Sequence, residues 1–260
     1  MYNIIMPKAS ENFLLSVVIP SYNEHANLQK GTLDKVEHYL TKNGYKYEVI
    51  VVDDGSNDGS LEFVQGFVEE NPEFRLIENS HTGKAGAVTR GMLSAKGDFI
   101  LFTDMDQATP IEEVKKLLEY KDEFDVVIGS RNNTRRGAPL SRKIMAKGMI
   151  MLRTFLVGLP EIKDTQCGFK LFSKKASKEV FSKFEKIHGS FKQIKNSAVT
   201  AGFDIELLSI AESLGFKIKE VPVEWLYVET RRVSPIRDSI DGLMDLFKIR
   251  KRKIKGVYKS

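Results

Sequence analysis

The sequence predicts an α/β fold built on a mainly parallel sheet with helices on both faces. Two observations support this prediction. Continuous apolar, β-branched runs alternate along the first half of the chain with segments whose apolar residues recur at helical spacing. Polar or acidic clusters follow directly after several of those runs. Ligands bind beyond the carboxyl ends of the strands in such sheets, so these clusters are the candidate site.

The first half of the chain supplies five predicted strands, over residues 14–19, 47–52, 74–77, 99–103 and 126–128. Helices are predicted between them over residues 24–40, 61–68 and 86–93. A further helix is expected to begin with a capping box, in which Thr109 caps, Pro110 takes the first helical position and Glu112 lies three residues after the cap.

The second half of the chain is less regular. It predicts an amphipathic segment over residues 140–159 that is basic at its start, a turn into a short strand over 164–172, a helix over 203–214, a half-exposed strand over 217–223 and a helix over 236–249. We expect one domain over residues 12–235, followed by an amphipathic helix and a basic tail over 236–260.

Length and composition limit the classes of protein to which this chain can belong. A chain of 260 residues can bury a core, and no stretch has the ~18 apolar residues of a membrane span. No signal peptide is recognisable. Because Cys167 is the single cysteine of the sequence, an intramolecular disulfide is excluded, and we therefore expect a cytosolic protein. Six of the eight residues 248–255 are basic, which is typical of a solvated, frayed end or of a segment that meets anionic lipid. No aromatic-interleaved basic surface appears, so nucleic acid is not an expected partner.

The strongest chemical signal is the pair Asp104 and Asp106 at the end of the apolar run 99–103. Two carboxylates placed so close repel each other unless a cation lies between them. Oxygen ligands suit Mg²⁺ or Mn²⁺, which often share them with substrate phosphates. The alternative interpretation is a pair of solvated loop acids.

Other clusters each allow a functional and a structural interpretation. Asp53 and Asp54 could accept hydrogen bonds from a ribose or a base, or could belong to the turn formed with Gly55 and Ser56. The turn over residues 81–90 could present amides and a lysine to a phosphate, or could simply cap a surface helix. Acids beside glycine in residues 164–170 and 202–206 could hold a base or orient a sugar.

Taken in order, residues 17–24, 51–56 and 104–106 resemble the motifs of inverting family-2 glycosyltransferases. Within that family the chain most resembles the polyprenyl-phosphate sugar synthases, and among these the dolichyl-phosphate β-glucosyltransferase branch. The segments behind this narrower resemblance are 83–88, 129–131, 164–172 and 203–207. The resemblance covers roughly residues 14–250 and implies a GT-A type nucleotide-diphosphosugar transferase fold.

The resemblance also implies roles for individual residues. It implies a nucleotide diphosphosugar donor, Mg²⁺ or Mn²⁺, and a polyprenyl or dolichyl phosphate acceptor. The nucleotide sugar would be lined by Pro20, Tyr22, Glu24, Asp53, Asp54, Lys84 and Asp104. The metal would lie at Asp104 and Asp106, and the catalytic residues would be Asp106, Arg131, Asp164 and Asp204. Arg131 would face the acceptor phosphate, whereas Asp164 and Asp204 could each be a base or an orienting group.

The expected activity is inverting transfer of a hexose, glucose from UDP-glucose, to a polyprenyl or dolichyl phosphate for glycan or glycoprotein assembly. The alternatives are a GDP-mannose-dependent polyprenyl-phosphate mannose synthase, a family-2 transferase acting on a saccharide hydroxyl, and a non-catalytic nucleotide-sugar binding module. Many relatives carry membrane helices, and we expect none within this sequence. We therefore expect peripheral contact with the cytosolic membrane face through the helix around residues 142–157, which carries Arg142, Lys143 and Lys147, and through the basic tail.

Overall fold

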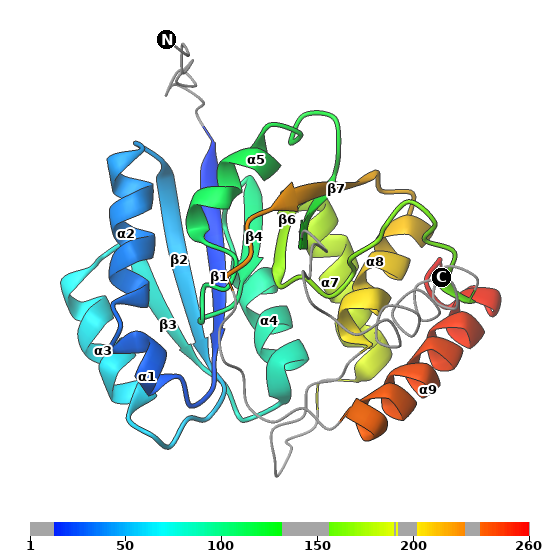
Figure 1. The fold of residues 1–260 in the computed structure, drawn as a ribbon, viewed down its shortest axis with the longest axis horizontal. Helices are drawn as coiled ribbons and strands as arrows, with labels where there is room; N and C mark the ends of the chain where they lie inside the picture. Colours follow the sequence, from blue (N-terminus) through cyan, green and yellow to red (C-terminus); the bar gives the residue numbers. More distant parts are fainter. Residues whose placement is uncertain (1–12, 132–155, 190, 192–201, 227–234, 260) are drawn as a thin grey trace, which may run out of the picture.

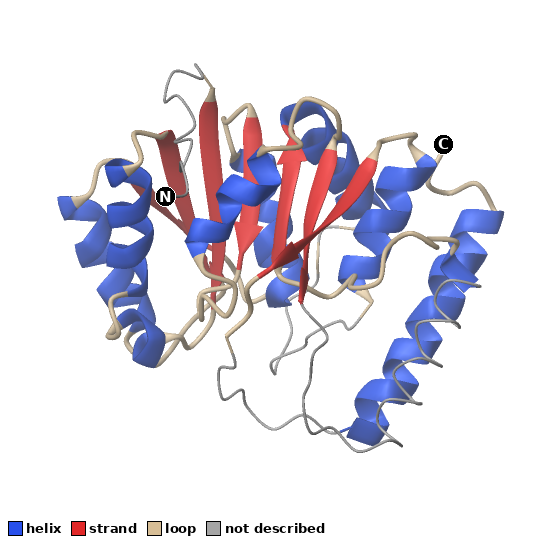
Figure 2. Cartoon of the chain, turned by 45° about the horizontal axis from the view of Figure 1, so that its top comes forward, coloured by secondary structure: helices blue, strands red, loops and turns tan. Residues whose placement is uncertain are grey.

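A seven-stranded sheet lies between two layers of helices in the computed structural model, which describes residues 13–131, 156–189, 191, 202–226 and 235–259 (Figures 1 and 2). The sheet order is β3-β2-β1-β4-β6-β5-β7. Its strands are β1 (Leu14–Ser21), β2 (Lys46–Asp53), β3 (Phe74–Glu78), β4 (Phe99–Thr103), β5 (Val126–Arg131), β6 (Phe169–Ser173) and β7 (Ile218–Val223). All pairings are parallel except those of β6, which runs antiparallel to β4 and β5. The predicted α/β class and mainly parallel sheet are confirmed.

The helices divide between the two faces because successive residues of a strand point to opposite sides. Val17 of β1 packs into the core under α1 (His25–Leu28), α2 (Thr32–Lys42), α3 (Ser60–Glu70), the 3₁₀ turn η1 (Ile111–Glu113) and α5 (Val114–Leu118). Val18 packs into the opposite core, under α4 (Gly83–Ser94), α7 (Lys174–His188) and α8 (Phe203–Ser213). The last helix, α9 (Pro235–Ile254), lies against α8 (Figure 1).

Two helix predictions need correction, and one further helix was missed. The single helix expected over residues 24–40 is two helices, because Gly31 adopts the left-handed conformation (φ 71°) and ends the first turn. The expected capping box is absent: Thr109 is buried with its hydroxyl 3.8 Å from Cys167 Sγ, and the helix begins as a 3₁₀ turn at Ile111. Helix α7 was not predicted. Its N-cap is Ser173, whose hydroxyl accepts a hydrogen bond from the amide of Ala176.

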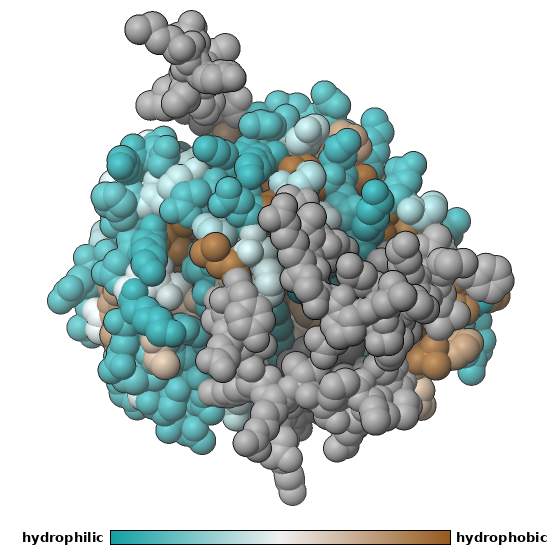
Figure 3. Space-filling view, viewed as in Figure 1, coloured by the Kyte–Doolittle hydropathy of each residue, from teal (hydrophilic) through white to brown (hydrophobic). Residues whose placement is uncertain are grey.

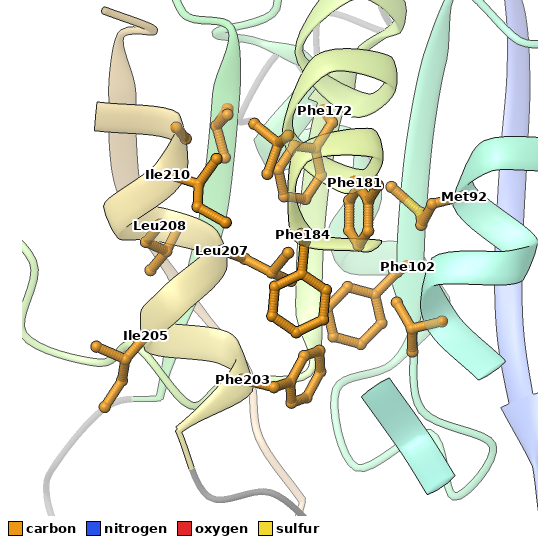
Figure 4. Close-up of a cluster of buried hydrophobic side chains, with 14 of the residues drawn as sticks. Met92, Phe102, Phe172, Phe181, Phe184, Phe203, Ile205, Leu207, Leu208 and Ile210 are labelled. Carbon is orange, nitrogen blue, oxygen red and sulfur yellow. The ribbon is translucent and has the colours of Figure 1, made fainter. Parts of the chain in front are cut away.

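An aromatic cluster fixes α7 and α8 on the sheet (Figure 4). The ring of Phe203, in the first turn of α8, lies 6.2 Å from that of Phe102 in β4 and 6.5 Å from that of Phe184 in α7. Burying each such ring contributes roughly 2 to 3 kcal/mol. The first turn of α8 is therefore held beside the central strand.

A buried carboxylate joins α9 to α8. Glu206 accepts hydrogen bonds from Arg252 Nη1 at 2.7 Å and from the hydroxyl of Tyr258 at 2.8 Å, and it lies 3.0 Å from His188 Nε2. Burial alone would raise the pKa of Glu206, but the contact with His188 and the charge of Arg252 together lower it below its ordinary value. The basic tail is thus not a frayed end: it is helical through Ile254, and Tyr258 beyond it is buried.

None of the helices in the described part of the chain is long and apolar enough to cross a membrane. Most of the amphipathic segment expected over residues 140–159, including Arg142, Lys143 and Lys147, lies outside the described residues.

The carboxylate of Glu206 should contribute stability that depends on pH. Glu206→Gln removes a charge that hydrogen bonds stabilise only in the folded state, so we expect a loss of about 2 to 3 kcal/mol in the free energy of unfolding at neutral pH. Because the folded pKa lies below the unfolded one, the difference from wild type should be constant above about pH 5 and shrink as pH falls below about 4. Urea titrations across this range measure it.

Glu212→Gln is the matched control for this measurement. Glu212 also lies on α8 and pairs with α9, through Lys253 Nζ at 2.8 Å, but it is 42% exposed. Its replacement should cost less than about 1 kcal/mol. Equal losses for the two variants would contradict the role assigned to Glu206.

Candidate active site

The site lies where several strand ends meet. The parallel strands β1, β2, β4 and β5 end at one edge of the sheet, and the antiparallel strand β6 begins there, since Thr103 at the end of β4 pairs with Phe169 at the start of β6. The loop that precedes β6 therefore meets the loops that follow the parallel strands. This reversal brings residues 164–168 beside Asp104 and Asp106.

Asp104 and Asp106 occupy a crowded acidic position after β4. Asp104 Oδ1 pairs with Lys84 Nζ at 2.5 Å, and Asp106 Oδ1 accepts from the amide of Ala108 at 3.0 Å. Gly168 is required beside them, because a Cβ there would collide with the Asp104 carboxylate. Burial, and then the charge of Asp104, raise the pKa of Asp106, although the Ala108 amide and Lys84 oppose the shift. The second aspartate is thus poorly compensated by the protein itself.

Lys84 is the cation that the protein places against this pair. Burial would lower the pKa of Lys84, but the nearby carboxylates of Asp104 and Asp204 raise it above its ordinary value. Lys84 is therefore charged at neutral pH and lies against the aspartate pair. Lys84 is the second residue of α4, and its role on the donor side stays a prediction.

The residues fit a divalent cation that is shared with a substrate. The described residues hold no group of three or more Asp, Glu, His or Cys side chains able to bind a metal, so the protein offers a two-carboxylate set. Such a set suits Mg²⁺ or Mn²⁺, which complete their coordination with water and substrate phosphates. Beside it, Gln107 carries a buried Oε1 with no hydrogen-bond partner. An amide oxygen is a hard ligand of the kind that Mg²⁺ and Mn²⁺ accept, and this one belongs to the residue that follows Asp106.

The aspartate pair and a clamped arginine line the same pocket. Asp104, Asp106, Arg131 and Trp225 all contribute to its walls. The guanidinium of Arg131 lies 6.0 Å from the centre of the Trp225 ring, within the range of a cation–π contact. The backbone just beyond Trp225 is hydrogen-bonded to the loop that follows β4, since the amide of residue 226 donates to the carbonyl of Ala108 at 2.7 Å.

Asp164 holds this arginine in a fixed orientation. Its Oδ2 accepts from Arg131 Nε at 2.7 Å and from the Arg131 amide at 3.0 Å, while Oδ1 accepts from Nη2 at 2.8 Å. Burial would raise the pKa of Asp164, but the hydrogen bonds and charge of Arg131 lower it below its ordinary value. Asp164 is consequently a weak base, and the geometry favours the orienting role over the basic one.

Asp204 is committed to a buried lysine that the sequence interpretation missed. Lys170 is fully buried, and its Nζ donates to Asp204 Oδ1 and to the carbonyl of Cys167, each at 2.5 Å. The same ammonium lies 5.2 Å from the centre of the Phe102 ring, and Lys84 Nζ lies 5.9 Å from it. Lys84 and Lys170 thus both lie within cation–π range of Phe102, and each forms an ion pair with a different aspartate.

Asp54 occupies the helix N-terminus for which the sequence allowed either a phosphate contact or a simple cap. Its carboxylate accepts from the amides of Thr82 at 2.8 Å and Gly83 at 2.7 Å, at the start of α4, and from Asn79 Nδ2 at 2.7 Å. A carboxylate at this position also interacts favourably with the helix dipole. Asp53 in turn accepts from the amide of Ser56 at 2.9 Å. Asp53 thus makes the turn contacts of the structural interpretation, whereas Asp54 caps α4 and occupies the amides of residues 82 and 83.

The remaining predicted nucleotide residues lie at the end of β1. Pro20 pairs with Val52 in the sheet, and the ring of Tyr22 stacks on His81 with centroids 4.3 Å apart. Glu24 Oε2 accepts from the side chain of Asn27 at 2.6 Å.

Strained backbone marks the same edge of the sheet. Among the described residues, the non-glycine residues with positive φ are Asn23, His81 and Gln107, in the loops that follow β1, precede α4 and follow β4. Such strain is concentrated at functional sites.

Comparison with known proteins decides the family. The family model described as Glycosyl transferase family 2 matches residues 16–181. The chain belongs to glycosyl transferase family 2. This family-2 chain is 31% identical over 269 residues to the dolichyl-phosphate beta-glucosyltransferase of Dictyostelium discoideum, an alignment that covers 96% of the chain and 77% of the relative.

Solved structures confirm the GT-A type fold. The family-2 chain matches mannosyl-3-phosphoglycerate synthase from Rubrobacter xylanophilus with a TM-score of 0.66 at 15% identity, covering 95% of this chain and 76% of that one. It also matches glucosyl-3-phosphoglycerate synthase from Mycobacterium tuberculosis, in complex with Mn²⁺, UDP and glucosyl-3-phosphoglycerate, with a TM-score of 0.59 at 17% identity, covering 92% and 81%.

Three residues of this family-2 site were missed by sequence reasoning. Lys170 lies in an apolar strand. A lysine in such a strand indicates a buried ammonium group that needs a carboxylate partner, and this signal could have led to the pair. Trp225, the single tryptophan, follows a half-exposed strand directly. Gly168 belongs to a recognised segment, but only the fold places it against Asp104.

Neutralising Asp54 should destabilise the fold, whereas neutralising Asp106 should not. Asp54→Asn places an amide donor against the donors of residues 82 and 83, so the free energy of unfolding should fall by about 3 kcal/mol. Asp106→Asn keeps its bond from Ala108 and removes a poorly compensated charge, so stability should be unchanged or rise by up to about 1 kcal/mol. Chemical denaturation of both variants tests this, and equal losses would contradict it.

Proposed function

We propose that this family-2 glycosyltransferase transfers glucose from UDP-glucose to a polyprenyl or dolichyl phosphate with inversion at the anomeric carbon. The observation that carries the proposal is the guanidinium of Arg131, which Asp164 holds in the same pocket that Asp104 and Asp106 line. A fixed guanidinium matches the geometry of a phosphate. The names of the relatives, dolichyl-phosphate beta-glucosyltransferases from several eukaryotes, support this acceptor and this sugar.

The donor would bind on the side of Asp104 and Asp106. Mg²⁺ or Mn²⁺ held there would supply positive charge that stabilises the departing diphosphate. Lys84 adds a second cation, and it can exchange its contact with Asp104 for one with a diphosphate oxygen because its charge is maintained. Tyr22 directly follows β1 and Asp53 is the last residue of β2, and these neighbouring strand ends suit the nucleoside.

Transfer would proceed by a single displacement. An oxygen of the lipid phosphate forms a bond to the anomeric carbon while the bond from that carbon to the diphosphate oxygen breaks, and the electron pair leaves with UDP. A phosphate monoester has a second pKa near about 6, so the nucleophile is already an anion at neutral pH and needs no general base. This agrees with the lowered pKa of Asp164 and with the commitment of Asp204 to Lys170.

The substrate also suggests where the enzyme works. A polyprenyl phosphate resides in a membrane, so we propose that the protein acts as a peripheral enzyme on the cytosolic membrane face, in glycan or glycoprotein assembly. The basic tail is the described segment whose composition suits that contact.

The purified chain should convert UDP-glucose and dolichyl phosphate into UDP and a glucosylated lipid when Mg²⁺ or Mn²⁺ is present. Product analysis should show the β-anomer, and Asp106→Asn or a chelator should reduce the rate by about a hundredfold or more. GDP-mannose and a free saccharide acceptor should be poor substrates in parallel reactions. Faster transfer from GDP-mannose, or transfer to a saccharide hydroxyl without lipid phosphate, would contradict the proposal.

Arg131 should determine the requirement for the acceptor. Arg131→Ala should raise the KM for the lipid phosphate by about tenfold or more, which corresponds to about 1.4 kcal/mol, and leave the Kd of UDP unchanged. Arg131→Lys should recover only part of the loss, because an ammonium cannot make the bidentate contact with Asp164. Weaker UDP binding with an unchanged acceptor KM would place Arg131 on the donor side instead.

A further inference from the structure

Exposed apolar side chains gather on one helix. In the part of the chain that the structure describes, the exposed large hydrophobic residues are Trp225, Leu226, Met244, Phe247 and Ile254, and the last three lie on α9. Their exposed fractions are 54%, 55% and 72%. Separations of three and seven residues place them on one side of a helix. Figure 3 shows brown side chains among teal ones at the right of the view, where Figure 1 places α9.

The opposite side of α9 is turned into the protein. Leu246 and Ile249 are buried in the core beneath α8. Arg250 Nη1 donates to the carbonyl of Leu156 at 3.2 Å, and Lys253 Nζ donates to that of residue 157 at 2.7 Å. Together with Arg252, which is bound to the buried Glu206, three of the six basic residues in 248–255 therefore serve to hold the helix in place.

The other three basic residues face outward beside the apolar ones. Lys248, Lys251 and Lys255 are exposed. Lys248 Nζ pairs with Asp245 Oδ1 at 2.9 Å, and among the described residues the other two lysines have no ion pair. Lysines interleaved with phenylalanine and isoleucine on one helix face are the pattern of an interfacial helix, whose apolar side chains enter the lipid while the ammonium groups meet the headgroups.

We propose that this α9 face, made of Met244, Phe247, Lys248, Lys251, Ile254 and Lys255, docks the protein on the surface of an anionic lipid bilayer. Charge favours lipid over another copy of the chain, because two such faces would bring lysines against lysines. Composition favours lipid over a different protein, since lysine is depleted in protein interfaces.

Docking through the α9 face would also orient the pocket. Glycine is needed at position 202, because a Cβ there would lie 2.7 Å from the Cβ of Asp245 on α9. Two residues later, Asp204 pairs with Lys170 beneath the pocket. The helix that meets the lipid is thus fixed against the helix that supports the site. The value of this orientation for catalysis rests on the proposed function, whereas lipid binding by the α9 face does not.

Flotation with vesicles tests the proposal. The full chain should bind phosphatidylcholine vesicles that contain phosphatidylserine and bind those of phosphatidylcholine alone much more weakly. Lys251→Gln and Lys255→Gln should each weaken binding about fivefold. Phe247→Ser should weaken it about tenfold. Lys42→Gln and Lys46→Gln remove exposed lysines at α2 and β2, on the opposite flank of the sheet from α9 (Figure 1), and should leave binding near wild type.

Equal losses for the α9 and control lysines, or no binding by wild type, would overturn the proposal. It would also be overturned if Phe247→Ser abolished self-association in an ultracentrifuge while vesicle binding stayed unchanged, because a second copy would then be the partner. Transfer to dolichyl phosphate in detergent separates this test from the proposed function. If the wild-type protein binds vesicles but transfers no sugar, the proposed function is refuted and the docking face stands. If it transfers sugar but does not bind vesicles, the docking face is refuted and the proposed function stands.

Discussion

A fully buried lysine connects the elements on which the site depends. Lys170 of β6 donates to Asp204 at the start of α8 and to the carbonyl of Cys167, and it lies over the ring of Phe102 in β4. An unpaired buried ammonium is very costly, so this arrangement is stable only when strand, loop and helix are all in place. The pocket-forming loop before β6 and the helix that carries α9 are consequently positioned by the same interaction.

The sheet and its edge were largely predictable from the sequence, whereas the direction of β6 was not. Apolar runs and helical spacing predict the parallel strands because burial on both faces requires them. Strand β6 is also apolar, with Leu171 and Phe172 on opposite faces, and this pattern is the same in either direction. Only the pairing of Thr103 with Phe169 shows that β6 begins where β4 ends, which is what brings residues 164–168 to the site.

The acidic residues were found from the sequence, but their tasks differ in a way that only contacts reveal. Asp54 and Asp164 have amide or guanidinium donors on both carboxylate oxygens, and they position α4 and Arg131. Among the described residues, Asp106 accepts a hydrogen bond from the Ala108 amide alone, and its pKa is raised by burial and by Asp104. A carboxylate that the fold does not compensate is suited to a cation brought by a substrate. The fold thus separates supporting acids from the pair suited to binding.

The same separation applies to the basic tail. Its composition predicts affinity for anionic lipid, but composition cannot distinguish Arg252, which is bound to the buried Glu206, from Lys251 beside it, which is exposed. Adjacent residues differ by about 100° around a helix, so one run of basic residues serves two surfaces. The inward residues attach α9 to α8 and to residues 156 and 157, and this attachment turns the other lysines outward. Lipid contact at α9 and support of the pocket by α8 are therefore properties of one continuous packed unit.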